Sequence, residues 1–416
     1  MRTNAGPARI LYCESSADGT IGGSHYCLLY LVEHLDRAQY EPMVVFYETH
    51  PLLPRFQAAA KTIVHPQDSP VVWGGTNGFT RLLRRGVNFL KFLGTVVRHV
   101  AFLRRHRVAL VHLNNSITRH QDWMLAASLA GVPCVVHERG LNTEYTARDR
   151  AYARRVSLII PMSAWIRDHM VERGVPGDNI RIMYDGLDPE KVKVTTDATR
   201  LREQWNVCTS ARVVGIVGNI RAWKGQETVV RAVIEVAKHH PDVVCFFVGA
   251  ATRGDDAYLT NLQAMVAEAG IERNVRFTGY QKEVPSLMNL MEFVIHASVA
   301  PEPFGMVVLE AMAQRKAVIG SRAGGPVEMI VEGETGLTFP PGDAQTLAAR
   351  MGELLADPER SRRMGEAGYK RLLQEFTMAK YMDEIHAAYK AILARKPVPA
   401  EIGLRAVSRA PAGRHA

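Results

Sequence analysis

Two glutamates, Glu302 and Glu310, stand eight positions apart in the run Glu-Pro-Phe-Gly-Met-Val-Val-Leu-Glu. Gly305 can turn the chain from a loop into a helix, so the amides of Gly305, Met306 and Val307 would be uncommitted donors at a helix amino terminus. Glu310 would lie about two turns further in, where a carboxylate can accept two hydroxyl hydrogens of a ribose. The run therefore predicts a site that binds hydroxyl and phosphate oxygens.

A second chemical segment is the run Gly-Asn-Ile-Arg-Ala-Trp-Lys-Gly from Gly218 to Gly225, which follows a strand-like stretch. Its lysine, Lys224, can place a fixed positive charge on a diphosphate and stabilise the negative charge that grows as the phosphate leaves. A solvated surface lysine is the alternative interpretation. Arg221 is a further cation in the same segment.

Glycines and a histidine are candidates in the first half of the chain. Gly22 and Gly23 lie between a strand-like run and a helical pattern, so they permit a tight turn and close approach of the backbone to an anion. His137 ends the run Cys-Val-Val-His, and strand carboxyl ends in open α/β sheets border the crevice where ligands bind. His112 and Asn114 end a neighbouring strand and are candidates for an acceptor side.

Short β-rich apolar runs alternate with longer helical patterns, which predicts βαβ units and mostly parallel sheets. With 416 residues, the chain exceeds the size at which a single core usually divides. A polar stretch separates two series of strands, so we expect an α/β protein with two consecutive Rossmann-like domains. The strands are predicted near residues 10–12, 43–46, 110–113, 134–137 and 158–160, and then near 213–217, 243–248, 275–277, 293–295 and 317–319.

Composition and charge exclude several classes of protein. The formal net charge of +9 suits an anionic ligand, an anionic membrane surface or a nucleic acid. The sequence has no zinc-finger spacing, no RNA-recognition aromatic motif and no dense basic run with interleaved aromatics, so no nucleic-acid partner is expected. No aspartate pair has the context of a divalent-metal site, and we expect no metal and no cofactor.

The cysteines and the amino terminus bear on location. The five cysteines are widely spaced and mostly lie in apolar runs, which predicts small buried residues in a reducing compartment. The start of the chain lacks the apolar core of a signal peptide, and no uninterrupted apolar window is long enough to span a bilayer. We therefore expect a cytoplasmic protein whose membrane contact, if any, is peripheral.

The run from Glu302 to Glu310 resembles the Glu, seven residues, Glu signature of glycosyltransferase family 4, the retaining group 1 glycosyltransferases. This resemblance implies the GT-B fold, in which two Rossmann-like domains face each other across a cleft. The likeness covers nearly the whole chain apart from residues 66–107 and the tail after residue 395. The supporting matches are Gly22-Gly23, His137, Ser163, Asp185–Asp188, Gly218–Gly225, Phe277–Tyr280, Ala323–Pro326 and Glu334–Phe339.

The same patterns predict the domain boundaries. An acceptor-side domain is expected over residues 1–188, a linker over 189–211, and a nucleotide-sugar-binding domain over 212–375. Residues 376–395 have apolar side chains at helical spacing and are predicted to form one or two helices that return to the N-terminal domain. Residues 396–416 show little periodicity and are predicted to be a disordered tail.

In the second domain, the resemblance implies that Glu302 holds the donor sugar together with the backbone of the next residues, Phe304, Gly305 and Met306. Glu310 would fix the ribose. The nucleotide base would be bordered by the segment Phe277 to Tyr280, chiefly Gly279 and Tyr280.

For the diphosphate, the resemblance implies contacts with Lys224 and with the turn at Gly22 and Gly23. The family commonly has arginine directly after the first glycine of the Gly218 segment, where this chain has Asn219, and Arg221 is a candidate substitute. The basic side chains and a helix dipole would neutralise the diphosphate without a metal.

The catalytic residues are expected to be Glu302, Lys224 and His137, the last of these holding a hydroxyl of the transferred sugar. Either Glu302 acts as a nucleophile or it orients the sugar. Orientation is favoured because retaining GT-B enzymes lack a consistently placed nucleophile.

The predicted function is that of a hexosyltransferase-like retaining glycosyltransferase. Its donor would be a nucleotide diphosphate sugar, with uridine diphosphate sugars the family's commonest choice, and its acceptor a glycan or a lipid-linked glycan. A nucleotide-sugar epimerase of the same fold and a non-catalytic sugar-nucleotide-binding protein are the alternatives. A nicotinamide oxidoreductase would need a Gly-x-Gly-x-x-Gly turn followed by an acidic residue, and the sequence lacks that set.

The stretch from Arg81 to Arg107 has the pattern of an interfacial helix. Its apolar residues follow helical spacing beside basic ones, namely Leu83, Val87, Leu90, Val97 and Val100 beside Arg84, Arg85, Lys91, Arg98, Arg104 and Arg105. One interpretation is peripheral contact with an anionic membrane, at its inner face. The other is a helix packed on the first domain with solvated cations. The oligomeric state stays open.

Overall fold

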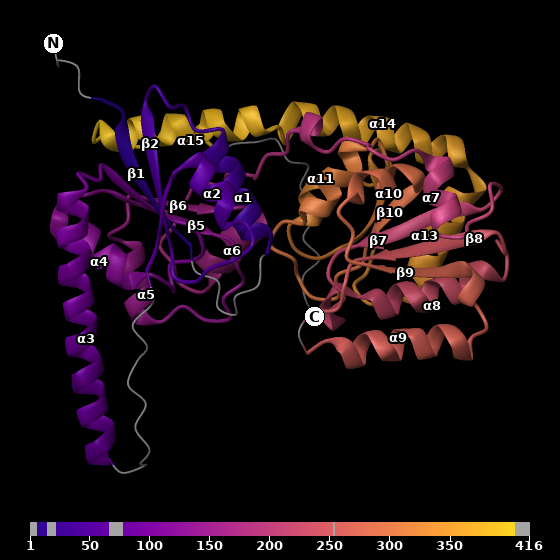
Figure 1. Ribbon diagram of the computed structural model, residues 1–416, viewed down its shortest axis with the longest axis horizontal. Helices are drawn as coiled ribbons and strands as arrows, with labels where there is room; N and C mark the ends of the chain where they lie inside the picture. The colour runs from indigo at the N-terminus through magenta and orange to yellow at the C-terminus, as the bar shows by residue number, and fades with distance from the viewer. Residues whose placement is uncertain (1–5, 15–21, 66–77, 253, 404–416) are drawn as a thin grey trace. The chain divides into compact units, whose positions relative to one another are not determined.

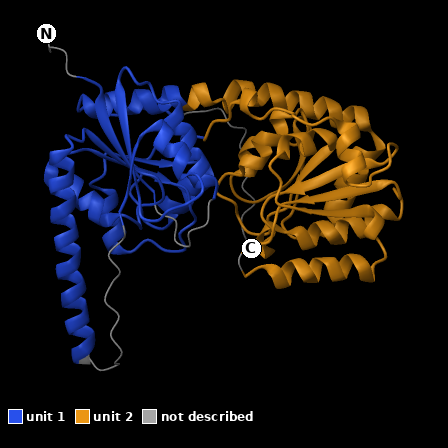
Figure 2. Cartoon of the chain, viewed as in Figure 1, with its two compact units in different colours: residues 1–184, 382–404 blue, residues 185–381, 405–416 orange. Residues whose placement is uncertain are grey.

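The computed structural model describes residues 6–14, 22–65, 78–252 and 254–403. The chain divides into two compact units (Figure 2). The first comprises residues 1–184 and 382–404, and the second comprises residues 185–381 and 405–416.

The first unit is built on a six-stranded parallel sheet in the order β3-β2-β1-β4-β5-β6 (Figure 1). Its strands are continuous runs of apolar, often β-branched residues, and most of these side chains are buried. Both properties are expected of a parallel sheet, whose two faces are covered by helices. The strands are β1 (Ala8–Glu14), β2 (Tyr40–Phe46), β3 (Lys61–Val64), β4 (Leu110–Leu113), β5 (Cys134–Glu138) and β6 (Leu158–Pro161).

Helices connect the successive strands of this sheet, namely α1 (Gly23–Glu33), α2 (Leu53–Ala59), α3 (Gly78–Arg105), α4 (Gln121–Ala130) and α5 (Ala147–Ala153). A further helix, α6 (Ala164–Glu172), follows the last strand. Side chains cap α5 and α6: Thr146 accepts a hydrogen bond from the Asp149 amide, and the Ser163 hydroxyl accepts one from the Ile166 amide at 3.2 Å.

The second unit has a six-stranded parallel sheet of its own, in the order β12-β11-β10-β7-β8-β9. Its core lies between this sheet and its helices, chiefly α8 and α13. The strands are β7 (Arg212–Val217), β8 (Val243–Val248), β9 (Val275–Gly279), β10 (Phe293–His296), β11 (Ala317–Ser321) and β12 (Gly336–Phe339). The helices are α7 (Ala198–Gln204), α8 (Gln226–Ala237), α9 (Asp256–Glu268), α10 (Val284–Leu290), α11 (Met306–Ala313), α12 (Pro326–Met329), α13 (Ala344–Ala356) and α14 (Pro358–Glu375), with short 3-10 turns at Pro189–Lys191, Ala222–Lys224 and Glu272–Asn274. The last helix, α15 (Met378–Leu393), begins in the second unit and belongs to the first from Met382 onward.

Both sheets have the doubly wound order of a dinucleotide-binding fold, so the prediction of two Rossmann-like domains is confirmed. In each sheet the chain first adds two strands on one side of the first strand and then returns to add three strands on its other side. The crossover falls between β1 and β4 in the first unit and between β7 and β10 in the second. Ligands of such sheets bind at this switch point, outside the carboxyl ends of the strands.

The structure differs from the sequence expectations in the short elements. β3 and β12 have four residues each and were not among the predicted strands. The predicted linker over residues 189–211 lies within the second unit. It contains α7, whose Leu201 is buried, and the amides of Thr195 and Thr196 donate to the Ser286 hydroxyl at 2.9 and 3.1 Å. A seven-residue helix in a polar stretch carries too little periodicity to be recognised.

The C-terminal segment predicted as one or two helices over residues 376–395 contains one helix, α15 (Met378–Leu393), which counts with the first unit from Met382 onward. The predicted disordered tail over 396–416 includes described residues up to 403, and Ile402 is buried there. The rest of that predicted tail lies outside the described residues.

Two helical glycines of the second unit give a matched test of its packing. A Cβ added at Gly365 in α14 would lie 1.9 Å from the Arg315 carbonyl oxygen, whereas at Gly352 in α13 it would meet nothing within 4 Å. Replacing Gly352 by alanine should stabilise the protein by roughly 0.5–1 kcal/mol, because glycine disfavours a helix interior. Gly365→Ala should instead destabilise it by about 1–3 kcal/mol through overpacking. Denaturant unfolding measures both, and stabilisation by Gly365→Ala would contradict the packing described.

Candidate functional site

The switch point of the second unit brings together two of the predicted chemical segments. Lys224 follows β7 and Glu302 follows β10, and these two strands are neighbours in the sheet. The Lys224 ammonium lies 2.7 Å from Oε1 of Glu302. The sequence separated these residues by 78 positions, and the fold makes them an ion pair.

Glu302 is held by three donors. Besides Lys224 on Oε1, its Oε2 accepts a hydrogen bond from Nε2 of His296 at 2.7 Å and from the Ser298 hydroxyl at 2.7 Å. The Glu302 side chain is only 12% exposed. Burial alone would raise its pKa, but His296 and Lys224 outweigh burial and hold the pKa well below its usual range. Glu302 is therefore ionised at neutral pH.

Two glycines after β11 determine where the Glu302 backbone lies. A Cβ at Gly324 would lie 2.2 Å from the Glu302 carbonyl oxygen, and a Cβ at Gly325 would lie 2.5 Å from that of Pro303. The Gly325 amide donates to the Glu302 carbonyl at 2.8 Å. The predicted Ala-Gly-Gly-Pro match is therefore a structural support: only residues without a Cβ let the two loops come this close.

Helix α11 begins where the sequence placed it, at Met306, with Gly305 in the left-handed region at φ +90°. Phe304 is buried and its ring packs against Phe376, so its backbone rather than its side chain is available for a ligand. Glu310 lies one turn into α11 and is partly buried. Burial raises the pKa of its carboxyl, since no cation near it offsets the loss of hydration.

The segment from Gly218 to Gly225 is packed against the chain that follows β10. Gly225 has φ +74°, and a Cβ there would lie 1.9 Å from the Ala297 carbonyl oxygen. The Lys224 ammonium also lies 4.3 Å from the centre of the Trp223 ring, a cation–π contact. Helix α8 starts directly after this segment, so its amino terminus adds partial positive charge beside Lys224.

The other cation of the segment, Arg221, is engaged elsewhere. Its Nε donates to the Thr252 hydroxyl at 2.7 Å and lies 3.4 Å from a carboxylate oxygen of Asp255. Asn219 is exposed, and its carbonyl accepts a hydrogen bond from the Gln226 side chain at 3.0 Å. Arg221 is therefore not brought to Glu302 as Lys224 is.

The predicted base-binding residues end β9. Gly279 has φ +66°, and Tyr280 directly after it is 71% exposed. A large aromatic side chain left in water at a strand carboxyl end is available to stack on a planar ring.

The first unit contains a series of buried polar side chains, hydrogen-bonded to one another, at its own switch point. Nε2 of His112, on β4, lies 3.0 Å from Nδ1 of His137, on β5. Nδ1 of His112 is hydrogen-bonded to the hydroxyl of Tyr389, which lies 3.2 Å from that of Tyr12. Burial, with a smaller effect of Arg139, lowers the pKa of His112 to about 3 and that of His137 well below its usual range. Both imidazoles are therefore neutral.

A second buried cluster lies at the carboxyl ends of β1 and β4, beside the turn that contains Gly22 and Gly23. Glu14 accepts hydrogen bonds from the amides of Asn114 and Asn115, the latter at 2.9 Å, and Asn114 accepts from Nε of Arg139 at 2.9 Å. A Cβ at Gly22 or Gly23 would meet nothing within 4 Å, so both glycines border open space.

Sequence reasoning missed four residues of these clusters: His296, Ser298, Glu14 and Arg139. The signal for three of them was available, since each lies at or just after the carboxyl end of a strand, which was the argument for His137. His296 is the last residue of β10, Glu14 the last residue of β1, and Arg139 directly follows β5. Ser298 has no comparable signal.

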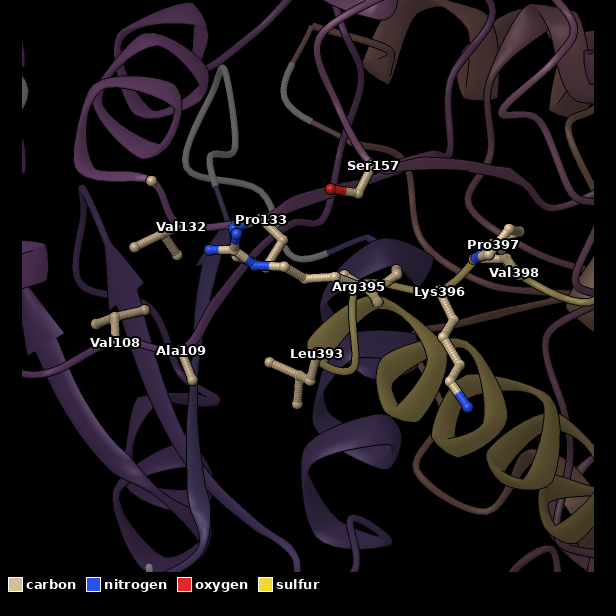
Figure 3. Close-up of a pocket in the computed structure, with 12 residues that line it drawn as sticks. Val108, Ala109, Val132, Pro133, Ser157, Leu393, Arg395, Lys396, Pro397 and Val398 are labelled. Atoms are coloured by element: carbon tan, nitrogen blue, oxygen red, sulfur yellow. The ribbon is translucent and has the colours of Figure 1, made fainter. Parts of the chain in front are cut away.

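A pocket of about 600 Å³ in the first unit is not part of these clusters (Figure 3). It lies at the amino ends of β4, β5 and β6, next to Ala109, Pro133 and Ser157, and beside Arg395 after α15. Its lining has no carboxylate or histidine, and ligands of these sheets bind at the other ends of the strands. The described residues contain no group of three histidine, cysteine or acidic residues able to hold a metal ion.

Comparison with known proteins gives matches along most of the chain. Residues 197–371 match the family described as glycosyl transferases group 1, and residues 22–186 match the glycosyl transferase 4-like domain. The lipopolysaccharide core biosynthesis glycosyltransferase LpsE of Rhizobium meliloti is 31% identical over 248 residues, which are 59% of this chain and 67% of that protein. N-acetyl-alpha-D-glucosaminyl L-malate synthase of Bacillus anthracis is 29% identical over 218 residues, 52% of this chain and 55% of that protein. The chain thus spans about half the length of some of the curated relatives it matches.

Among solved structures, HepE of Anabaena in complex with UDP superposes with a TM-score of 0.76 at 24% identity, covering 92% of this chain and all of HepE. HepE has also been crystallised with UDP-glucose.

The raised pKa of Glu310 makes a prediction about stability. A carboxyl whose pKa is higher in the folded than in the unfolded state costs stability as pH rises through the unfolded value of about 4.3 and on to the folded value. Glu310→Gln cannot ionise, so its Tm advantage over the parent should grow as the pH rises above about 4, by about 2–4 °C for each kcal/mol relieved. The exposed Glu334, changed to glutamine, is the control. Parallel pH profiles for both variants would contradict burial of the Glu310 carboxyl.

Proposed function

Since the chain belongs to the group 1 glycosyltransferase family and has its two-domain GT-B fold, we propose that it transfers a sugar from a nucleotide diphosphate donor to an acceptor hydroxyl with retention of anomeric configuration. The observation that carries the proposal is the Lys224–Glu302 ion pair at the switch point of the second unit. It places one cation and one oriented carboxylate where a doubly wound sheet binds its ligand.

In this proposal the donor lies along the carboxyl edge of the second sheet. Lys224 and the amino terminus of α8 compensate the diphosphate, and their charge stabilises the leaving nucleotide as the glycosidic bond breaks. Glu310 accepts hydroxyl hydrogens of the ribose. Tyr280 and Gly279 border the base. We extend to this chain the uridine diphosphate donors with which HepE was crystallised.

The donors around Glu302 favour an orienting role for this residue over that of a nucleophile. Its two oxygens already accept hydrogen bonds from Lys224, His296 and Ser298, which occupy three of about four lone-pair sites and reduce the reactivity of both oxygens toward carbon. A carboxylate with a depressed pKa is also a weaker base and hence a weaker nucleophile. The same carboxylate can accept a hydrogen bond from a sugar hydroxyl and hold the ring in place.

The first unit would supply the acceptor side. A neutral His137 can exchange a hydrogen bond with a sugar hydroxyl without adding charge, and the turn at Gly22 and Gly23 leaves space for a phosphate oxygen to approach the backbone. The acceptor class we propose is a glycan or a lipid-linked glycan. We propose a cytoplasmic location, since none of the five cysteines forms a disulfide bond, four of them being buried and Cys208 exposed.

A donor panel tests the function. Sugar nucleotides with different bases and sugars are screened by thermal shift, where a donor at a hundred times its Kd adds about 2.7 kcal/mol to the stability. The best donor, carrying a labelled sugar, is then incubated with glycan and lipid-linked acceptors, and the anomer of the product is determined. Glu302→Gln should bind the donor but transfer the sugar about 10²-fold more slowly or worse. Failure of every sugar nucleotide to stabilise the protein would refute the proposal, and binding without turnover would favour a non-catalytic binding protein.

The two cations of the Gly218 segment should differ in importance. Lys224→Ala is expected to lower turnover about 10²-fold or more, because Lys224 sits where charge develops. Arg221→Ala should cost less than about tenfold, since Asp255 and Thr252 already engage its guanidinium. Asn219→Arg, which restores the cation common in the family, should speed transfer. Turnover of the best donor is the measurement, with the exposed Lys238→Ala as control. Equal losses in the Arg221 and Lys224 variants would overturn this assignment.

A further inference from the structure

Helix α3 is packed against its unit along only part of its length. Toward its carboxyl end, Val96 and Leu103 are buried and His99 stacks on Trp123 of α4 with ring centres 3.7 Å apart. From Gly78 to Thr95 no described side chain is buried. In Figure 1 this amino-terminal part extends well beyond the sheet. It is touched near Phe92, where the Arg148 guanidinium of α5 lies 5.1 Å from the ring centre.

The projecting part of α3 carries an apolar stripe. Of the fifteen large apolar side chains that are exposed among the described residues, seven lie on this helix, from 37% exposed at Leu93 to 74% at Phe79. Their spacing of three, four and seven positions puts them on one face of the helix. They are Phe79, Leu82, Leu83, Phe89, Leu90, Leu93 and Val97.

The same helix concentrates the charge of the protein. Its 28 residues include seven basic ones and no acidic one, so it accounts for seven of the nine net positive charges of the whole chain. The seven basic residues are Arg81, Arg84, Arg85, Lys91, Arg98, Arg104 and Arg105, and all of them except Arg84 are exposed. The basic character of the protein is thus a property of this one helix rather than of the nucleotide site.

We propose that α3 docks the protein on the surface of an anionic lipid bilayer, lying in the interface with its apolar stripe among the acyl chains and its basic side chains at the headgroups. An exposed apolar stripe beside cations is the pattern of an interfacial helix. Neither feature alone selects a bilayer. A nucleic acid would use the cations but not the stripe, and an apolar protein groove would use the stripe but not seven cations.

Two other occupants fit the helix less well. The helix has the length and hydropathy of a membrane span, but Lys91 and Arg98 would then lie inside the hydrocarbon region, where a charge is costly. A second copy of this chain would bring seven cations against seven cations. A bilayer rich in acidic headgroups compensates them instead.

The docking proposal goes beyond the proposed sugar transfer, because it rests on α3 alone and not on the donor site. Its failure and that of the proposed function are distinguishable, since α3 variants should bind the donor in solution as the parent does. The test uses the full chain and vesicles of phosphatidylcholine with or without phosphatidylglycerol, in flotation at low and at physiological salt. The protein should float with the phosphatidylglycerol vesicles, less so at higher salt, and should stay behind with phosphatidylcholine alone.

Matched variants separate the contribution of the basic side chains of α3 to vesicle binding from that of its apolar stripe. Arg85→Gln with Lys91→Gln should weaken binding by about fivefold for each residue, the value of one cation near an anionic surface. Lys370→Gln with Lys390→Gln changes the net charge equally at exposed positions elsewhere and should leave binding unchanged. Leu82→Ser with Leu90→Ser should abolish most binding, whereas Val171→Ser, at an exposed position of α6, should not. Circular dichroism and donor binding confirm that each variant is folded.

Several results would overturn the docking proposal. Absence of flotation at both salt concentrations removes it, and so do equal losses in the α3 variants and their controls. Protein that resists extraction by alkaline and high-salt washes would point to a spanning helix. Dimers in sedimentation velocity that the Leu82 and Leu90 changes dissociate, without any vesicle binding, would assign the stripe to a second copy of the chain.

Discussion

The second unit is organised around one constraint: an ionised carboxylate almost removed from water needs compensation from every side. At Glu302 that compensation comes from Lys224 after β7 and from His296 and Ser298 at and after the end of β10. These groups can converge only because Gly225, Gly324 and Gly325 let the loops approach without a Cβ. The formation of the ion pair therefore depends both on the order of the strands and on the glycines in the loops that follow them.

The switch point of the first unit is built from the same topology with different buried groups. His112 on β4 and His137 on β5 are kept neutral by burial and are linked through hydrogen bonds to Tyr389 and Tyr12. Beside them, Asn114 is hydrogen-bonded to both Glu14 and Arg139. The second unit is thus centred on an ion pair, whereas the first adds neutral imidazoles and hydroxyls beside its acidic and basic side chains. A doubly wound sheet specifies where a ligand lies, while the residues at the strand ends specify its chemistry.

The family, the two Rossmann-like domains and ten of the twelve strands that the structure describes could be predicted from the sequence, because apolar runs and the Glu302 to Glu310 motif carry strong local signals. The strands β3 and β12 were missed because each has only two large apolar side chains, whereas the equally short β4, β6 and β10 have three. The helix α7 was missed because a helix of seven residues depends on its neighbours for stability. At the site, single residues could be named but not their partners. Nothing local to Lys224 indicates a bond to Glu302, and nothing local to Arg221 indicates its engagement with Asp255. Long-range pairing of this kind is set by the crossover of the chain.

The path of α15 affects how the protein is made. Tyr389 on this helix completes the buried chain of hydroxyls and imidazoles in the first unit, yet it is separated from Tyr12 by the whole of the second unit. During synthesis, domains generally fold as units in the order in which they emerge from the ribosome. Here residues 185–381 of the second unit are one continuous stretch that can fold as soon as it is synthesised. The first unit needs residues 382–404 as well, so part of its interior stays uncovered until they have been made. The domain that is translated first is therefore the one that is finished last.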